Sequence, residues 1–314
     1  MKKPHSLNTT STLSNAVHFE HNSRLATRPS RARFNRASGF TLIELMVALV
    51  LGLLITAAAV QLFLGGLLTS KMQQANAELQ NSGVFGLDYV ARDLRLANYT
   101  NTVFPSLNER TPWGGLVLTA KTATVTDANI PIPASAPFIS TGLLSHSVGT
   151  GETVSTTLNE WQGLSNVNVA SDQLTIQFVA PNAMVNCEGD NVQAGDYVIQ
   201  RYFVRRASGT TGTDYGLACD ANTPTATGTT PVATPTTISG FGGAGELIMP
   251  RVDHFAVQLG TRLVTTVSRV ETVRLAYYTI NQYRAVAAAA RTAGTEPPRI
   301  VSVKTAVLVR STDD

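Results

Sequence analysis

The stretch that decides the fold lies at residues 40–70 and reads FTLIELMVALVLGLLITAAAVQLFLGGLLTS. Glu44 is the only charged residue in it, and residues 45–68 form an uninterrupted, mainly apolar run. As an α-helix this run spans about 36 Å, which exceeds the roughly 30 Å of a bilayer's hydrocarbon core. A buried helix of a soluble protein rarely has this length without charge, so the sequence predicts a membrane-spanning helix.

Charge is distributed unevenly on the two sides of this segment. Residues 1–39 contain seven Lys or Arg and one acid, a net +6, although the whole 314-residue chain carries only +3. The remaining 275 residues therefore carry −3, and the basic character belongs to the leader rather than to a nucleic-acid-binding domain. The positive-inside rule predicts that residues 1–39 lie in the cytoplasm and that the larger C-terminal part lies outside.

Three interpretations of the apolar segment remain open at this point. It could be a plain signal anchor, or a secretory signal peptide cleaved at Ala57-Ala58-Ala59, although the apolar run before that site exceeds the usual 7–15 residues. The third interpretation depends on the residues at the start of the run, Gly39-Phe40 and the lone acid Glu44.

The string GFTLIELMVALV, from Gly39 onwards, resembles the cleavage motif of type IV prepilins, in which a basic leader ends in Gly and the fifth mature residue is Glu. The resemblance implies that prepilin peptidase cleaves between Gly39 and Phe40 and that the new amine of Phe40 is N-methylated. It also implies that Glu44 pairs with the N-terminal amine of a neighbouring subunit and fixes its register in a filament.

The residue types suit these roles. Gly39 has no side chain and lets a protease approach the backbone closely. Glu44 lies in the first helical turn, where the helix dipole favours a carboxylate, but an acid at the membrane edge is costly. The alternative for Glu44 is an acid near a helix end that extends to the lipid headgroups.

A helical pattern continues beyond the membrane segment, with a face that recurs every three or four residues at Leu79, Gly83, Leu87, Val90, Leu94 and Ala97. Asn98 and Pro105 mark its end. The pattern predicts one helix over 40–98, apolar on all sides at first and amphipathic later; two helices broken at Gly65-Gly66 are the alternative.

The rest of the chain predicts an antiparallel sheet. Segments with alternating or β-branched sequence lie at 174–178, 197–205, 253–259, 273–280 and 300–309, with a weaker candidate at 115–119. Loops rich in Thr, Ser, Gly and Pro are expected at 121–170, 207–245 and 285–299. No strand alternates regularly with a helix, so the expected fold class is α+β, a type IV pilin-like long helix packed on an antiparallel sheet with long loops.

Two C-terminal segments carry a second resemblance. Residues 252–260, VDHFAVQLG, and residues 300–311, IVSVKTAVLVRS, are similar to strands of PilW-type minor pilins. The expected organisation is a cleaved leader at 1–39, a transmembrane and filament-core helix at 40–68, its amphipathic continuation at 69–104, and a periplasmic β-rich domain at 105–314. The implied location is the bacterial inner membrane, then the pilus at the cell surface.

Cys187 and Cys219 are the only cysteines in the chain. An exported domain meets an oxidising compartment, so a disulfide between them is expected, with two free buried thiols as the alternative. PilW-type proteins often carry such a pair.

The sequence contains none of the G-x-S-x-G, H-E-x-x-H, P-loop or G-x-G-x-x-G motifs. We therefore expect no catalytic residues, no metal and no cofactor. The expected function is that of a minor pilin that initiates, primes or caps a type IV pilus. The expected partners are prepilin peptidase, other minor pilins, the major pilin and the inner-membrane assembly platform. A pseudopilin of type II secretion, a tip adhesin using 207–245 and a signal-anchored enzyme are the alternatives.

Overall fold

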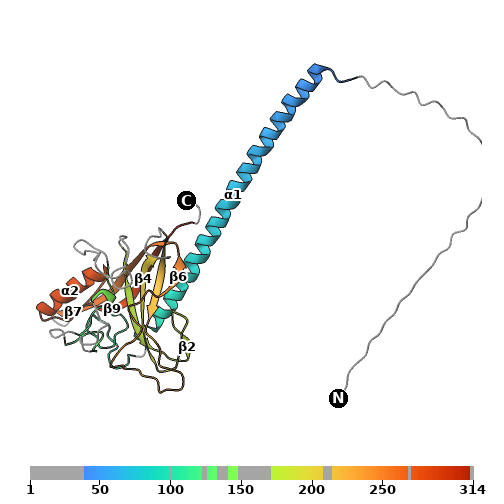
Figure 1. The fold of residues 1–314 in the computed structure, drawn as a ribbon. Coiled ribbons are helices and arrows are strands. Elements are labelled where there is room, and N and C mark those ends of the chain that lie inside the picture. Colours follow the sequence, from blue (N-terminus) through green and yellow to red (C-terminus); the bar gives the residue numbers. More distant parts are fainter. Residues whose placement is uncertain are drawn as a thin grey trace, which may run out of the picture. The chain divides into compact units, whose positions relative to one another are not determined.

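A computed structural model of the chain describes residues 39–99, 101–121, 126–132, 141–147, 171–207, 214–267 and 270–311 (Figure 1). The chain divides into two compact units, Met1–Leu62 and Phe63–Asp314. The predicted loop at 121–170 lies largely outside the described residues, which contain there only a short 3-10 helix, η1 (Thr141–Leu143).

Helix α1 (Leu42–Leu96) is a single element of 55 residues, so the prediction of one helix without a break at Gly65-Gly66 is confirmed. It is two residues shorter at each end than the predicted 40–98. At the C-terminal end the chain leaves the helix at Asn98, whose φ of 66° lies in the left-handed region. The hydroxyls of Thr56 and Thr69 donate to carbonyls of the preceding turn, which satisfies these polar groups within the apolar segment.

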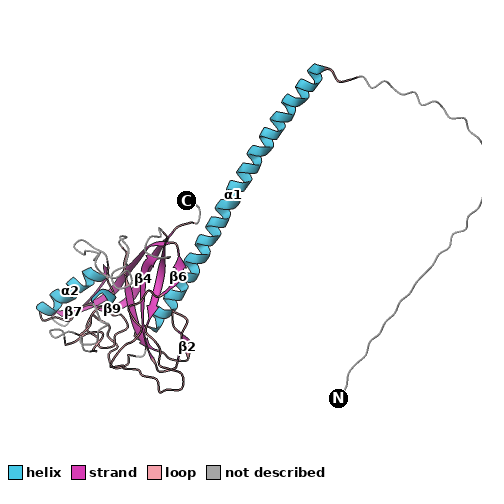
Figure 2. Ribbon diagram, in the orientation of Figure 1, coloured by secondary structure: helices cyan, strands magenta, loops and turns pink. Residues whose placement is uncertain are grey.

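In the described part of the chain the strands form three antiparallel sheets. Together with α1 they confirm the predicted α+β class, and Figure 2 shows the helices and strands in separate colours. The four-stranded sheet has the order β1-β4-β5-β6 and the three-stranded sheet the order β8-β7-β9. A two-stranded β2-β3 pair accompanies them. The bounds are β1 (Leu174–Val179), β2 (Met184–Val185), β3 (Asn191–Val192), β4 (Tyr197–Arg206), β5 (Tyr215–Ala221), β6 (Glu246–Pro250), β7 (Val252–Val267), β8 (Val270–Thr279) and β9 (Arg299–Val309).

Three predictions about these elements are wrong. Strand β5 lies inside the predicted loop 207–245; it is buried along almost its whole length, so its sequence lacks the alternation that marks a half-exposed strand. Helix α2 (Ile280–Thr292) replaces the end of the predicted strand 273–280 and much of the predicted loop 285–299. Residues 115–119 form no strand and contribute only an isolated bridge between Leu116 and Ile176.

Helix α2 owes its start to local chemistry. Thr279 accepts a hydrogen bond from the backbone N–H of Gln282, and the Gln282 side chain accepts one from the backbone N–H of Thr279. This reciprocal capping box satisfies two donors that a helix start otherwise leaves unpaired. The Ala-rich sequence that follows has high helix propensity.

The four-stranded sheet has apolar side chains buried on both faces. One face contributes Ile176, Tyr202 and Leu217 to the main core, whereas Tyr197 and Ile199 of the same sheet belong to a second cluster with Val117. The main core also takes in the three-stranded sheet and α2 through residues that include Phe255, Val257, Leu259, Ile280, Tyr283 and Ala287. Because both faces of the sheet are covered, nearly every residue of its central strands β4 and β5 is buried.

The C-terminal part of α1 packs on β4 and β6. Val90 is fully buried in the main core, and Gly86 faces Met249, whose Cε would lie 2.0 Å from a Cβ at that position. Tyr202 of β4 donates a hydrogen bond of 2.6 Å to the Asp93 carboxylate, and burial is the main cause that raises the pKa of Asp93. The C-terminal part of α1 is thereby fixed to the β-rich domain by close packing and by a buried polar contact.

Candidate functional site

The predicted cleavage site lies in the residues just before α1. Apart from its two chain neighbours, no described residue has an atom within 4 Å of a Cβ added to Gly39, and the Phe40 side chain is 83% exposed. The backbone around the peptide bond between them is therefore open to an approaching enzyme. Within the described part of Met1–Leu62, no side chain covers this bond.

Glu44 lies in the first turn of α1, as predicted, and is exposed. Its backbone N–H lies 3.3 Å from the hydroxyl oxygen of Thr41, which accepts from it as an N-cap residue does. The pattern Thr41-Leu42-Ile43-Glu44 is the sequence signature of a capping box, a signal that our sequence analysis missed. Thr41 thus starts the helix, which presents the Glu44 carboxylate one turn from Phe40.

The apolar surface of α1 is the second part of this site. Every residue from Phe40 to Leu68 is exposed, including large side chains such as Leu54 (62%), Leu62 (79%) and Phe63 (66%). Within the described residues, α1 is the one helix long and apolar enough to cross a membrane. A helix that is apolar all round requires lipid or other apolar helices as its surroundings.

The cysteines are the one predicted pair that the fold brings together from distant positions. Cys187, between β2 and β3, is bonded to Cys219 of β5, and both are buried in the main core. The expected disulfide is confirmed, and the alternative of two free thiols is wrong. Among the described residues, no group of three His, Cys, Asp or Glu is placed to hold a metal ion.

These features describe an α+β protein whose long apolar N-terminal helix fits membrane anchoring. A family model described as the prokaryotic N-terminal methylation motif matches residues 34–60. No similar curated protein and no similar solved structure was found. The matched motif supports a type IV pilin-like protein, either a pilin or a pseudopilin, and the proteins that carry this motif are structural rather than catalytic. It implies processing by a prepilin peptidase and assembly with other pilins.

Removing the disulfide is expected to destabilise the domain substantially. The bond closes a loop with a sequence separation of 32, and in the chain-entropy model such a loop contributes about 3–4 kcal/mol. We expect the double variant Cys187→Ala/Cys219→Ala to lose about this free energy of unfolding in urea titrations of the detergent-solubilised chain. A loss below about 1 kcal/mol would contradict the prediction, because it would mean that the cross-link restricts the unfolded chain far less than the chain-entropy model requires.

Glu188, beside the disulfide, should make stability depend on pH. Burial is the main cause that raises the pKa of Glu188 from 4.5 to about 7, and the nearby carboxylates of Asp220, Asp190 and Glu246 add to it. The backbone N–H of Ala221 donates to the Glu188 carboxylate and acts in the opposite direction. The folded protein therefore holds this proton more tightly than the unfolded chain does. Its contribution to stability is complete below pH 4.5 and is lost as the pH rises through about 7.

The variant Glu188→Gln tests this dependence. It keeps an oxygen acceptor for Ala221 and removes the ionisation. We expect the fall in the urea midpoint between about pH 5 and about pH 8 to be smaller in Glu188→Gln than in the unmodified chain. Asp93, whose pKa burial also raises, is not among the groups that shift the pKa of Glu188 and contributes equally to both proteins. Equal pH dependence of the two proteins would show that Glu188 does not titrate in this range.

Proposed function

We propose that the protein is a minor pilin of a type IV pilus that helps to initiate, prime or cap pilus assembly. The observation that carries the proposal is the methylation motif followed by an apolar helix that continues without a break into the β-rich domain. If the segment were a secretory signal peptide, cleavage would occur within the apolar run and would separate it from the rest of the helix. A helix that spans a bilayer and then packs on a domain suits a subunit that moves from membrane to filament.

In this mechanism the leader at 1–39 stays in the cytoplasm and prepilin peptidase cleaves between Gly39 and Phe40. The residues at 40–68 then form the transmembrane and filament-core part of the helix, and the domain from 105 onwards is periplasmic. The new amine of Phe40 is methylated, and the Glu44 carboxylate of one subunit pairs with the terminal amine of its neighbour. An ion pair in apolar surroundings is favourable only when both charges meet, so it selects one axial register.

The finer assignment to PilW-type minor pilins is supported by two strands. The segments that resemble PilW-type sequences form the first part of β7 and most of β9, and these two strands pair antiparallel with each other. The two segments therefore belong to one structural unit in the C-terminal part of the chain.

The proposal is tested by the N-terminal peptide of the mature protein, identified by mass spectrometry from membrane and sheared-pilus fractions. A peptide that begins with N-methylated Phe40 supports it. A terminus at Val60 would indicate ordinary secretion, and a terminus near Met1 would indicate a plain anchor. Either of the last two results would overturn the proposal.

A pseudopilin of type II secretion is the second candidate, because the matched motif is common to pilins and pseudopilins. Deleting the gene distinguishes the two. Loss of pili with normal exoprotein secretion supports the minor pilin, whereas normal piliation with impaired secretion supports the pseudopilin.

A further inference from the structure

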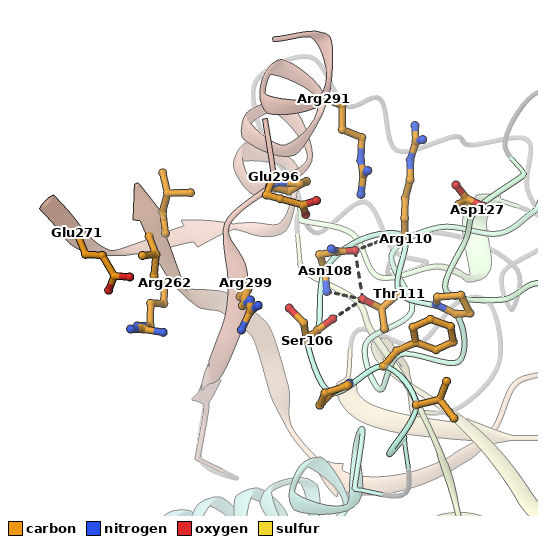
Figure 3. A pocket seen from close by; sticks show the side chains of 17 residues that line it. Ser106, Asn108, Arg110, Thr111, Asp127, Arg262, Glu271, Arg291, Glu296 and Arg299 are labelled. Carbon is orange, nitrogen blue, oxygen red and sulfur yellow. Dashed lines mark hydrogen bonds between the residues drawn. The ribbon is translucent and has the colours of Figure 1, made fainter. Parts of the chain in front are cut away.

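A hollow of about 1040 Å³ in the β-rich domain is rich in arginine (Figure 3). Arg110 lies in the segment that follows α1, Arg262 in β7, Arg291 in the last turn of α2, and Arg299 at the start of β9. Four guanidinium groups from four segments therefore line one surface depression. The carboxylates of Asp127, Glu271 and Glu296 also line it.

Arg262 and Arg299 are directly opposite each other on the paired strands β7 and β9. Side chains opposite each other lie on the same face of a sheet, and like charges in that position destabilise it. Both residues are exposed, and neither forms an ion pair within the described residues. The domain alone thus bears a repulsion that an anionic ligand between the two guanidinium groups would relieve.

The opposite wall of the hollow is fixed by internal contacts. Arg291 is ion-paired with the buried Glu109, which also accepts a hydrogen bond of 3.4 Å from Tyr283. Thr111 donates to the carbonyl of Ser106 at 2.7 Å and holds the loop that carries Arg110 (Figure 3). A wall whose shape is already set loses little entropy when a ligand binds.

The composition of the hollow indicates which kind of anion fits. Its interspersed carboxylates would repel a uniformly charged phosphate backbone. Its rim includes the exposed side chains Val103 (76%) and Phe104 (44%), together with Leu263 and Val264 of β7. Arginine beside apolar side chains is typical of protein interfaces. These properties favour a polypeptide that carries acidic and apolar residues.

We infer that the hollow binds a segment of a neighbouring pilin subunit that carries both acidic and apolar residues, with Arg262 and Arg299 holding its acidic side chains and Arg110 contacting it from the opposite wall. This inference rests on the proposed function, because it requires the protein to assemble with other pilins. A guanidinium group binds a carboxylate through two parallel hydrogen bonds, so the site would also fix the orientation of the bound segment.

The first test is the full-length double variant Arg262→Glu/Arg299→Glu, expressed in place of the unmodified protein. It keeps a like-charge pair at the two opposed positions and reverses the sign of the charge that a partner meets. We expect the amount in sheared filaments to fall about tenfold, with cleavage before Phe40 unchanged. Arg274→Glu is the matched control, because Arg274 is an exposed β8 residue outside the hollow and its variant should assemble normally.

The second test identifies the bound group. The second variant is the full-length Arg262→Lys/Arg299→Lys. A carbodiimide adds to a nearby carboxylic acid to form an O-acylisourea, and attack by the introduced lysine amine then forms an amide and releases a urea. We expect mass spectrometry of cross-linked filaments to find this amide between Lys at 262 or 299 and an Asp or Glu of another pilin subunit.

Each other outcome decides against the inference. Normal incorporation of the double Glu variant, or cross-links only to the chain's own Glu271 or Glu296, would overturn the inference and leave the proposed function intact. Normal filaments that lose binding to a duplex DNA oligonucleotide would assign the hollow to a phosphate polymer and overturn it as well. Absence of cleavage before Phe40 in the unmodified protein would overturn both proposals.

Discussion

Replacing Gly39 with Val is expected to leave almost all of the protein as a precursor that keeps residues 1–39, and to remove it from filaments. Apart from its two chain neighbours, no described residue has an atom within 4 Å of a Cβ at Gly39, so the substitution leaves the described fold undisturbed. The effect would arise in the complex with the peptidase, where the side chain displaces the scissile bond from the catalytic groups. A displacement of about 1 Å can slow a reaction roughly a hundredfold.

The matched control is Gly52→Val, in the same helix. A Cβ there also meets nothing within 4 Å, but Gly52 lies well beyond the scissile bond. Immunoblots of whole cells separate precursor from mature protein by size, and mass spectrometry identifies the terminus. If Gly39→Val is processed as efficiently as Gly52→Val, cleavage does not occur after Gly39.

Replacing Arg201 with Met is expected to cost about 3–5 kcal/mol of unfolding free energy, because it leaves a buried carboxylate without its counter-charge. Arg201 of β4 lies 3.3 Å from Asp220 of β5, and both side chains are almost completely buried. The guanidinium group also donates to the carbonyl of Gly243 at 2.9 Å and stacks 4.0 Å from the centre of the Phe203 ring. Even with Asp220 nearby, burial lowers the pKa of Arg201 to about 10.

Two further variants isolate the cause of this loss. In Arg201→Met/Asp220→Leu neither charge remains, and we expect much of the stability to return, since buried pairs replaced by apolar residues are often neutral. Arg274→Met changes an exposed arginine and should stay within about 0.5 kcal/mol of the unmodified chain. Urea midpoints of the detergent-solubilised chains provide the measurement. A loss below about 1 kcal/mol in Arg201→Met would show that water or other groups solvate Asp220.

The parts of the fold that the sequence predicted are those with a local pattern. Helix α1 follows from an apolar run and a three-to-four spacing, and β1, β7 and β9 from alternation or β-branched residues. Strand β5 was missed because it is buried throughout, and α2 was missed because its Ala-rich sequence follows directly on a strand without a loop between them. Tertiary surroundings, rather than local periodicity, determine β5. Helix α2, in contrast, carries local signals of its own, the capping box at Thr279 and Gln282 and the Ala-rich sequence that follows.

The same distinction applies to the sites. Gly39, Phe40 and Glu44 lie within six consecutive residues, so their pattern can be read directly from the chain. The opposition of Arg262 and Arg299 depends on the register of β7 on β9, and the Arg201–Asp220 pair on that of β4 on β5. Register results from the packing of all strands together, and no single-segment pattern encodes it.

The disulfide also has a mechanical consequence for a protein that is pulled. The chain between Cys187 and Cys219 contains the whole of β4, the strand that links β1 to β5. Because force passes through the S–S bond, this segment carries no tension when the domain is stretched from its ends. At about 3.4 Å per residue, roughly 100 Å of chain is withheld from extension. A filament subunit that unfolds under load would therefore extend by less than the same chain without the disulfide, and β4 would remain inside the covalent loop.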